Sequence, residues 1–559
     1  MSERAQGFDY VVIGAGSAGC VLASRLSEQR DRSVLLLEAG GRDSHYLLRM
    51  PLGFLRAMMQ PRFSWGYLSE PEPQLNGRRV PLPRGKVLGG SGSINGMFYM
   101  RGHSLDFDSW KSMGCTGWGY ADVLPYFKRM ETSWRGAGKY HGADGPLRVA
   151  AIDTSRLLHE PLFRTAVPAG FNTSEDIHGD VEEGFARGEV TIDRRGRRAS
   201  TSWAYLHPVM GRSNLTVTLG ALVTRILVEN GRAVGVEYVR EGKTHQVRAN
   251  REVVLAGGTY NSPHLLMLSG IGPADDLRKL AIKPVADLAG VGRNLSEHPH
   301  IPVEFAATQA VTFLRELRFD KVVWSVIRWK LFGTGAFATQ LNSCNVIIRT
   351  RPDLAQPDIQ LMCNPVRMDA RIWFPIVAPV QEHRMTADVV VLHERSRGWV
   401  KLRSSNPADA PRVLLNVMDD RADFETAIRG IRAARQIYAT QPQAAYVRRE
   451  LRPGAERQTD AQLEAYIRET CQVTQHPVGT CRMGTGADAV VDPELRVRGI
   501  EGLRVADASI MPTVPGGNTN AAVIMIAEKA SDLLLGRQAP AAESVRPSRQ
   551  AADEKPAVV

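Results

Sequence analysis

Residues 8–19 read FDYVVIGAGSAG, and this stretch decides the fold of the chain. The apolar run 8–13 predicts a buried strand, the glycines after it predict a tight turn, and residues 20–26 predict a helix. A second apolar run, 33–37, predicts another strand, which ends in Glu38. Strand, glycine turn, helix, strand and acid in this order are typical of a dinucleotide site in an α/β fold.

Each glycine of the turn has a physical role in such a site. Gly14 lets the chain turn tightly, Gly16 lets the backbone approach a pyrophosphate, and Gly19 lets the helix pack closely on the strand. The free amides and the positive end of the helix face the phosphate charge. Glu38 is placed to accept hydrogen bonds from ribose hydroxyls. This pattern alone leaves FAD and NAD both open as the ligand.

The length and charge of the chain exclude some classes of protein. A chain of 559 residues is too long for one hydrophobic core, so we expect two or more structural units. The net charge is +11, and the arginines that cause this excess of positive charge are spread along the chain. Their one tight cluster is Arg194, Arg195, Arg197 and Arg198. No nucleic-acid-binding motif accompanies this cluster. We therefore interpret it as a solvated basic surface and expect no nucleic-acid partner.

The cysteine pattern and the hydropathy bear on metal binding and compartment. None of the six cysteines forms a Cys-x-x-Cys pair, so we expect no metal site. Reduced thiols fit a cytoplasmic protein. The start of the chain is short and polar, without a secretory segment, and no apolar run approaches the roughly 20 residues of a membrane span. Peripheral attachment to the inner membrane is left open.

Further along the chain, two regions differ in character. Residues 83–102 are rich in glycine and serine between apolar neighbours, which suits a loop pressed against a flat ligand. Runs between 215 and 256 predict strands and turns, and residues 264–268 predict a short helix. From about 301 to 469, alternating runs such as 389–392 and 399–402 predict an antiparallel sheet. Residues 423–438 predict an amphipathic helix in this second region.

Four blocks of sequence together resemble one known family, the glucose–methanol–choline (GMC) oxidoreductases. They are residues 14–19 with Glu38, residues 85–97 (GKVLGGSGSINGM), residues 257–273 (GGTYNSPHLLMLSGIGP), and HPVGTCRMG at 476–484 followed by PGGNTN at 515–520. The resemblance extends over nearly the whole chain. Within the family, the sequence is similar to choline-dehydrogenase-like, acceptor-dependent alcohol dehydrogenases.

The resemblance implies FAD rather than NAD. It places the adenosine end on the first glycine turn and the flavin against residues 89–95, with Asn95 and Gly96 at the flavin and the Val223 backbone at the adenine. Some members tether the flavin covalently through a histidine just before that asparagine. Here this position is Ile94, which has no nucleophile, so we expect noncovalent FAD.

The resemblance also implies a domain order and a set of cofactor contacts. The expected fold class is α/β, α+β overall, with a Rossmann-like FAD-binding domain and a second substrate-binding domain built on an antiparallel sheet. The FAD-binding domain comprises 1–158, 200–300 and 470–537, the substrate side comprises the insertion 159–199 and 301–469, and 538–559 is a disordered tail. The expected cofactor contacts are Gly14, Gly16, Ser17, Gly19, Glu38, Ala39, Gly89, Ser91, Asn95, Gly96, Met97, Val223, Ala256, Asp507, Ala508, Asn518 and Thr519.

Two residues near the end of the chain are the expected catalytic pair. Oxidation of an alcohol removes a hydroxyl proton and a carbon-bound hydride, and flavin N5 takes the hydride. His476 is the candidate base for the proton, because an imidazole titrates near neutral pH. Asn520 is expected to hydrogen-bond the substrate oxygen. We expect His298 to shape a turn, and we leave Arg84 and Lys86 out of the site as solvated side chains.

The predicted function is FAD-dependent oxidation of a small alcohol to an aldehyde or ketone, with the electrons passed to an external acceptor, either a quinone or a dye. Two alternatives stay open: an oxidase that uses O2 and releases H2O2, and a lyase or fatty-acid photodecarboxylase on the same fold. Residues 339–345, TQLNSCN, lie where relatives line the pocket and carry no acid, which favours a neutral polar alcohol over choline. A homo-oligomer is compatible with the sequence.

Overall fold

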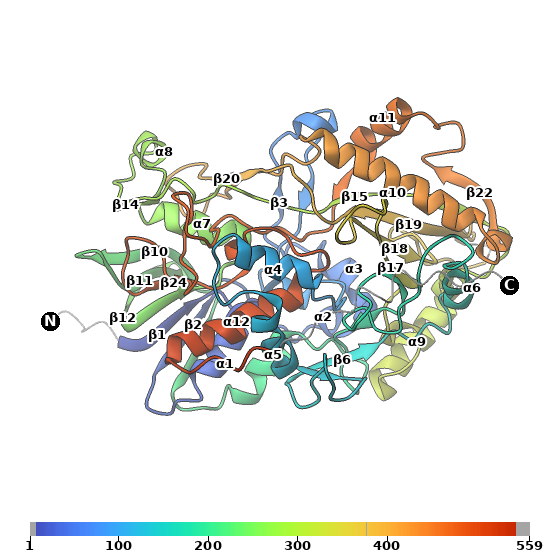
Figure 1. Cartoon of the computed structure of the whole chain (residues 1–559). Helices are drawn as coiled ribbons and strands as arrows, with labels where there is room; N and C mark the ends of the chain where they lie inside the picture. The colour runs from blue at the N-terminus through green and yellow to red at the C-terminus, as the bar shows by residue number, and fades with distance from the viewer. Residues whose placement is uncertain (1–6, 376, 544–559) are drawn as a thin grey trace.

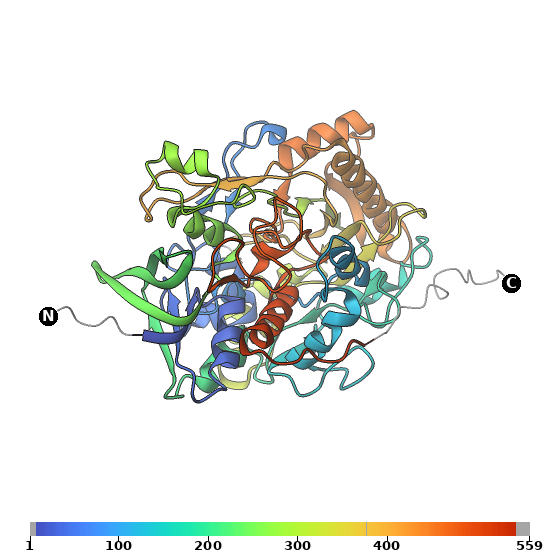
Figure 2. The same cartoon turned by 60° about the vertical axis from the view of Figure 1, so that its left-hand side comes forward.

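The structure, a computed structural model, describes residues 7–375 and 377–543. Two sheets dominate it, a mostly parallel one on the left of Figure 1 and an antiparallel one on the right. The predicted fold class is confirmed by this pair of sheets. Segments from both ends of the chain build the left-hand part, where α1 and α12 lie side by side (Figures 1 and 2).

The first sheet contains the glycine turn at the carboxyl end of its central strand. Its order is β10-β11-β12-β1-β2-β9, with β24 beside β12; β9, β2, β1, β12 and β24 run parallel. Their apolar side chains are buried because helices cover this parallel part. The strands are β1 (Gly7–Ile13), β2 (Val34–Glu38), β9 (Leu215–Leu219), β10 (Leu222–Glu229), β11 (Arg232–Arg240), β12 (Lys243–Leu255) and β24 (Leu503–Val505).

The second sheet is antiparallel throughout and forms one wall of the molecule's main cavity. Helix α10 (Arg421–Ala439) packs on it so closely that a Cβ at Gly430 would lie 2.5 Å from the Val389 side chain. Its strands are β7 (Gly184–Ala186), β15 (Pro299–Ile301), β16 (Glu304–Ala307), β17 (Cys344–Ile348), β18 (Ile359–Asn364), β19 (Arg384–Val391), β22 (Val447–Arg452) and β23 (Gln472–Val473).

Smaller elements complete the two halves. The other strands are β3 (Tyr67–Leu68), β4 (Pro81–Leu82), β5 (Glu131–Ser133), β6 (Leu147–Ala151), β8 (Glu189–Val190), β13 (Ile271–Gly272), β14 (Ala286–Asp287), β20 (Trp399–Lys401) and β21 (Arg412–Leu414). The other α-helices are α1 (Ser17–Leu26), α2 (Tyr46–Arg49), α3 (Phe54–Ala57), α4 (Ser104–Ser112), α5 (Tyr120–Met130), α6 (His159–Arg164), α7 (Gly258–Leu268), α8 (Ala274–Lys279), α9 (Phe319–Phe332), α11 (Asp460–Thr470) and α12 (Asn520–Leu535).

Two sequence-based predictions of single elements need correction. The run 399–402 was expected in the antiparallel sheet, but β20 pairs only with β21 in a separate two-stranded ribbon of the described structure. Helix α7 begins at Gly258, well before the predicted start at His264, and continues through Pro263. Proline lacks the amide that would bond the Thr259 carbonyl, and that carbonyl instead accepts a hydrogen bond from Thr480 Oγ1 at 2.5 Å.

The predicted tail, 538–559, is described only as far as Glu543. That last described residue is not free: its carboxylate lies 2.7 Å from Lys128 Nζ on α5, and its amide donates to the Ala121 carbonyl. The tail from 544 onward lies outside the described residues.

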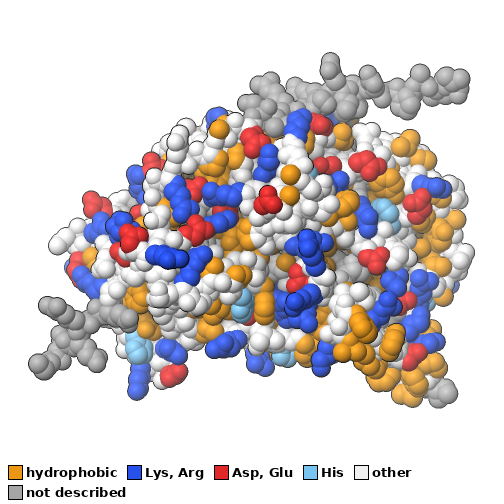
Figure 3. Space-filling view, turned by 90° about the horizontal axis from the view of Figure 1, so that it is seen from below, with side chains coloured by type: hydrophobic (Ala, Val, Ile, Leu, Met, Phe, Trp, Pro, Cys, Tyr) orange, Lys and Arg blue, Asp and Glu red, His pale blue; other side chains and the backbone are white. Residues whose placement is uncertain are grey.

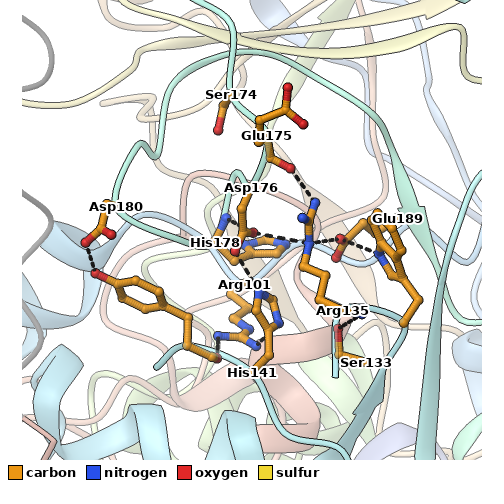
Figure 4. Close-up of polar contacts among 12 residues, drawn as sticks. Arg101, Ser133, Arg135, His141, Ser174, Glu175, Asp176, His178, Asp180 and Glu189 are labelled. Carbon is orange, nitrogen blue, oxygen red and sulfur yellow. Dashed lines mark hydrogen bonds and ion pairs between the residues drawn. The ribbon is translucent and has the colours of Figure 1, made fainter. Parts of the chain in front are cut away.

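A buried polar cluster joins the segment around Asp176 to β5 (Figure 4). The two ring nitrogens of His141 lie 2.9 Å from Glu131 Oε1 and 2.8 Å from Asp176 Oδ2. Glu131 also accepts from Arg101 Nη2 at 2.8 Å. Burial alone would lower the pKa of His141, but its hydrogen bonds to Asp176 and Glu131 raise it.

We expect His141→Gln to destabilise the protein most at mildly acidic pH. A group with a raised folded-state pKa contributes stability that is fully present below its unfolded value, about 6.5, and lost as pH rises through the folded value. The free energy of unfolding should fall by about 1–3 kcal/mol near pH 5.5 and by less near pH 9, measured by chemical denaturation. The exposed His245→Gln is the control. An equal loss at both pH values would contradict this account of the cluster.

Candidate active site

A cavity of about 750 Å³ lies between the two sheets. At one end it touches the β1–α1 turn, and at the other it reaches β18 and β19. Most of the sequence-predicted site residues line it: Gly14, Gly16, Ser17, Glu38, Ala39, Ser91, Asn95, Gly96, Met97, Val223, Ala256, His476, Asp507, Ala508, Asn518, Thr519 and Asn520. Gly19 and Gly89 were predicted with them but are absent from the cavity wall.

The geometry of the first turn explains its glycines. Gly14 has a φ of 95°, a conformation that side chains disfavour. A Cβ at Gly19 would lie 1.8 Å from the Gly14 carbonyl oxygen, so this glycine permits packing rather than ligand contact. A Cβ at Gly16 would meet nothing closer than Ala256 O at 3.9 Å. The space over Gly16 is therefore open cavity at the uncapped start of α1.

Glu38 has a structural task besides any ribose contact. Its Oε2 accepts from the Ala15 amide and its Oε1 from the Gly40 amide, both at 2.8 Å. Burial raises the pKa of this carboxyl group to about 7. Each carboxyl oxygen has a further lone pair. The Glu38 side chain therefore holds the turn through the two amides and can still accept a hydrogen bond from a ligand in the cavity that it lines.

The glycine-rich loop lies directly on the first turn. The Gly89 amide donates to Ala15 O at 2.7 Å, and a Cβ at Gly90 would lie 2.7 Å from the Gly16 Cα. Beneath the loop is Arg198, which is 1% exposed and donates from Nη1 to Asn95 Oδ1 at 2.6 Å. The predicted solvated cluster is therefore wrong for Arg198. No signal in the run of four arginines separates this buried member from its neighbours.

His476 and its neighbour Pro477 are held by hydrogen bonds to residues far away in the sequence. Its backbone amide donates to Glu297 Oε1 at 2.6 Å. The Thr259 hydroxyl, at the start of α7, donates to the neighbouring Pro477 carbonyl at 2.6 Å. Burial, followed by the nearby Arg84 charge, lowers the pKa of His476 to about 3. The imidazole is therefore neutral near pH 7. Arg84 and Lys86 also line the cavity, contrary to their exclusion from the predicted site.

The partners of His298 determine which nitrogen of His476 carries the proton. His298 Nε2 lies 3.0 Å from the Leu392 carbonyl, which can only accept, so His298 Nε2 carries a hydrogen. Burial holds the pKa of His298 well below its usual range, so this ring is neutral and its Nδ1 is an acceptor. His298 Nδ1 lies 3.1 Å from His476 Nδ1. The His476 Nδ1 therefore donates, and His298 does more than shape a turn.

The second nitrogen of His476 faces an amide in the cavity. With its proton on Nδ1, His476 has its lone pair on Nε2, which accepts a hydrogen bond from Asn518 Nδ2 at 3.0 Å. The Thr474 hydroxyl, 2.8 Å from His476 Nδ1, is a second acceptor for that proton. Asn518 Oδ1 is buried without a hydrogen-bond partner among the described residues. This pair of groups presents one proton acceptor and one unpaired amide oxygen.

The structure places Asn520 differently from its prediction as the catalytic amide. Its Oδ1 accepts a hydrogen bond from Ser17 Oγ at 2.6 Å, beside the start of α1. Asn520 is the first residue of α12, whereas Asn518 lies in the preceding loop and reaches His476. The sequence alone does not show whether Asn518 or Asn520 contacts the imidazole. The position at which α12 starts determines the direction in which each side chain points.

An acid also lines the substrate side of the cavity, which the sequence of 339–345 did not suggest. Asp388 comes from β19, and its Oδ2 lies 3.6 Å from His300 Nε2. From 339–345 only Gln340 and Leu341 reach the cavity.

Among the described residues no group of three or more His, Cys, Asp or Glu is arranged to hold a metal ion. None of the described helices has the length and apolar character of a membrane span.

Comparison with known proteins gives matches over almost the whole chain. The family described as GMC oxidoreductase matches residues 8–300 and again 394–527. The mitochondrial choline dehydrogenase of Mus musculus is 42% identical over 541 residues, 95% of this chain and 90% of that protein. The oxygen-dependent choline dehydrogenase of Rhizobium etli is 44% identical over 532 residues, 95% of this chain and 96% of that protein.

Solved structures also match over nearly the whole chain. A pyridoxine 4-oxidase from Mesorbium loti superposes with a TM-score of 0.85 at 30% identity, covering 95% of this chain and all, 100%, of that one. A variant of the formate oxidase of Aspergillus oryzae RIB40, studied for its FAD modification, gives a TM-score of 0.88 at 25% identity, covering 96% and 99% of the two chains.

The residues present fit FAD, the cofactor typical of the matched family. A side chain at Gly16 would fill the open space over the start of α1, where a pyrophosphate is expected. The cavity continues from there past the 90–97 loop to His476 and Asn518, whose buried Oδ1 lacks a partner. An extended dinucleotide matches this succession of donors and small residues.

We expect Gly16→Val to abolish FAD binding while the protein stays folded, because its side chain enters open cavity. Gly19→Val is the contrasting variant: its Cβ would lie 1.8 Å from a carbonyl oxygen, so it should prevent folding. Flavin absorbance per protein and circular dichroism measure the two effects. A folded Gly16→Val variant that is fully yellow would contradict the assignment of the pyrophosphate site.

Proposed function

Because this chain belongs to the GMC oxidoreductase family of FAD-dependent enzymes acting on CH–OH groups, we propose that it oxidises an alcohol with His476 as the general base. The observation that carries the proposal is the neutral imidazole whose Nε2 lone pair faces the cavity, 3.0 Å from the Asn518 amide. A base in that protonation state can accept a hydroxyl proton once the alcohol oxygen replaces the imidazole as the acceptor of the Asn518 hydrogen bond.

The proposed roles follow from the donors and acceptors at this point. FAD, when bound, would supply the acceptor for the hydride that leaves the alcohol carbon. His476 Nε2 takes the hydroxyl proton, and Asn518 Nδ2 donates a hydrogen bond to the alcohol oxygen as negative charge develops on it. His298 acts as a positioning residue, because its Nδ1 keeps the His476 proton on the far nitrogen. In this proposal Asn518 replaces Asn520 as the catalytic amide.

We further propose that FAD is bound noncovalently. Ile94 precedes Asn95 in the glycine-rich loop and lines the cavity with a hydrocarbon side chain, which cannot form a bond to the flavin. Acid precipitation of the wild-type protein should release all flavin into the supernatant. Yellow colour that stays with the precipitate would refute the noncovalent assignment.

The electrons pass to an external acceptor in this proposal. One of the similar proteins is named an oxygen-dependent choline dehydrogenase, so O2 is tested beside artificial acceptors. Turnover with a dye in the absence of oxygen, without H2O2 formation in air, identifies a dehydrogenase. Stoichiometric H2O2 in air identifies an oxidase.

For the substrate we propose a cationic alcohol of the choline type. Two of the similar proteins are named choline dehydrogenases, and Asp388 supplies a buried carboxylate on the substrate side of the cavity. The four carboxyl groups lining the described cavity are Glu38, Asp388, Asp409 and Asp507. Of these, Asp388 alone comes from the antiparallel sheet. The earlier preference for a neutral alcohol rested on 339–345, which provides little of this wall.

The function is tested with three variants of the FAD-loaded protein. His476→Ala should slow flavin reduction by alcohol about 100-fold or more while FAD stays bound, because the proton acceptor is lost. Asn518→Leu should slow the same step about 10- to 1000-fold through loss of an oxyanion donor. Asn520→Leu is the matched control and should change the reduction rate far less. Stopped-flow absorbance without oxygen measures the rates.

Two outcomes of these kinetics would overturn the assignment. Unchanged flavin reduction in His476→Ala would remove this residue as the base. A larger loss in Asn520→Leu than in Asn518→Leu, at equal FAD content, would return the amide role to Asn520.

The substrate proposal is tested by comparing choline with 3,3-dimethylbutan-1-ol, which has the same shape without the charge. Wild type should prefer choline, and Asp388→Asn should lower kcat/KM for choline at least about tenfold while affecting the neutral alcohol less. The isosteric change keeps the volume and the hydrogen-bonding acceptor. Equal losses for both alcohols would show that Asp388 does not recognise the cation.

A further inference from the structure

Helix α9 (Phe319–Phe332) is apolar on the face turned to solvent as well as on the face turned inward. Its inner face buries Ser325 and Trp329, and Trp329 Nε1 donates to Gly196 O at 2.8 Å. Phe319, Val323, Ile327 and Leu331 follow each other at four-residue spacing on the outer face and are 53%, 42%, 42% and 67% exposed. Such a row forms one continuous ridge on a helix. Trp324 and Phe332 flank it with 61% and 70% exposure.

Residues 371–375 and 377–380 extend this apolar surface. The Phe319 amide donates to Trp373 O at 2.9 Å, and the Phe319 and Phe374 rings lie 6.1 Å apart. The side chains of Ile372, Phe374, Val377 and Val380 in the loop are exposed. We call these four and the six apolar outer residues of α9 the α9 patch. Its ten side chains are exposed, and Phe319 and Phe374 join its two parts; so many exposed apolar side chains are unusual for a surface without a partner.

Cations border the carboxyl end of the α9 patch. Arg328 and Lys330 are exposed on the helix itself. The turn with Arg194 and Arg195 packs against the helix end, where a Cβ at Gly333 would lie 2.1 Å from Arg195 O. Within the described part of the chain, no carboxylate is within ion-pair distance of these four side chains. In Figure 3, hydrophobic side chains gather at the lower right with Lys and Arg side chains beside them.

We propose that the α9 patch docks the protein on a lipid bilayer that contains anionic headgroups. Phe, Trp, Leu and Ile on one face of a helix, with Lys and Arg beside them, are the side chains that bind at the boundary of headgroups and acyl chains. The unpaired arginines and lysine attract anionic lipid, and Trp324 has the amphipathic ring that suits this boundary. In this proposal Arg194 and Arg195 bind anionic headgroups, whereas the proposed oxidation of alcohols gives these two side chains no role.

Docking here would place the bilayer beside the substrate cavity. Met368 lines the cavity, is 47% exposed, and shortly precedes the loop of the α9 patch. An acceptor or substrate dissolved in lipid would then reach the cavity rim without crossing water. The docking proposal goes beyond the proposed oxidation of alcohols and does not depend on it.

Co-sedimentation of the full-length, FAD-loaded protein with vesicles tests the docking. Phosphatidylcholine vesicles with phosphatidylglycerol should carry the protein down at low salt, and pure phosphatidylcholine vesicles should carry much less. Raising the salt should weaken binding. Ile327→Asp should weaken binding about tenfold or more by placing a charge in the ridge. Val285→Asp is its control: Val285 is 48% exposed and immediately precedes β14, which lies on the opposite side of Figure 1 from α9.

The basic border is tested separately. Arg328→Glu with Lys330→Glu should reduce binding to anionic vesicles about tenfold or more, whereas the exposed pair Arg30→Glu with Lys243→Glu should reduce it much less. FAD content and flavin reduction by alcohol show that each variant is folded, and the vesicle assay itself needs no turnover. A failure of docking is therefore distinguishable from a failure of the catalytic proposal.

Three results would overturn the docking proposal. The first is no binding of wild type to either kind of vesicle. The second is equal binding by Ile327→Asp and Val285→Asp. The third is a dimer in solution that Ile327→Asp converts to monomers without any vesicle binding, which would make the α9 patch an interface between two copies of the chain.

Discussion

A neutral imidazole with its proton on one defined nitrogen is the constraint on which the candidate site depends. The Leu392 carbonyl accepts a hydrogen bond from His298 Nε2, which leaves His298 Nδ1 as the acceptor for the proton on His476 Nδ1. The remaining lone pair of His476, on Nε2, faces Asn518. Burial favours the neutral form of both rings because an uncompensated charge is costly away from water. A chain of hydrogen bonds that begins at a backbone carbonyl thus determines where the site can accept a proton.

The fold serves this constraint by holding three distant segments against one another. Helix α7 follows strand β12, and its Thr259 bonds both Pro477 and Thr480 around the histidine segment. Asn518 is brought in by the segment that starts α12, which packs on α1 next to the first glycine turn. The same packing that closes the nucleotide-binding half therefore positions the polar groups that face the antiparallel sheet.

The parallel-sheet half and the antiparallel-sheet half of the molecule contribute different groups to the cavity. The parallel sheet contributes glycine turns with little side-chain volume, where backbone amides can meet a phosphate. The antiparallel sheet contributes side chains such as Asp388, which differ in charge and shape and can discriminate between substrates. On the outer surface, α9 covers the apolar cluster near the cavity with one face and presents the other to the surroundings.

The sequence by itself determined the nucleotide fold, the glycine positions and the prominence of His476, because turns, strand runs and close approaches depend on local residue type. The arrangement of side chains between segments was decided only by the tertiary structure. It separated Asn518 from Asn520 by the start of α12, buried Arg198 near the exposed Arg194 and Arg195, and brought Asp388 from β19 to the cavity. Those outcomes depend on which way a helix starts and which strands pair, and neither is encoded in the spacing of a motif.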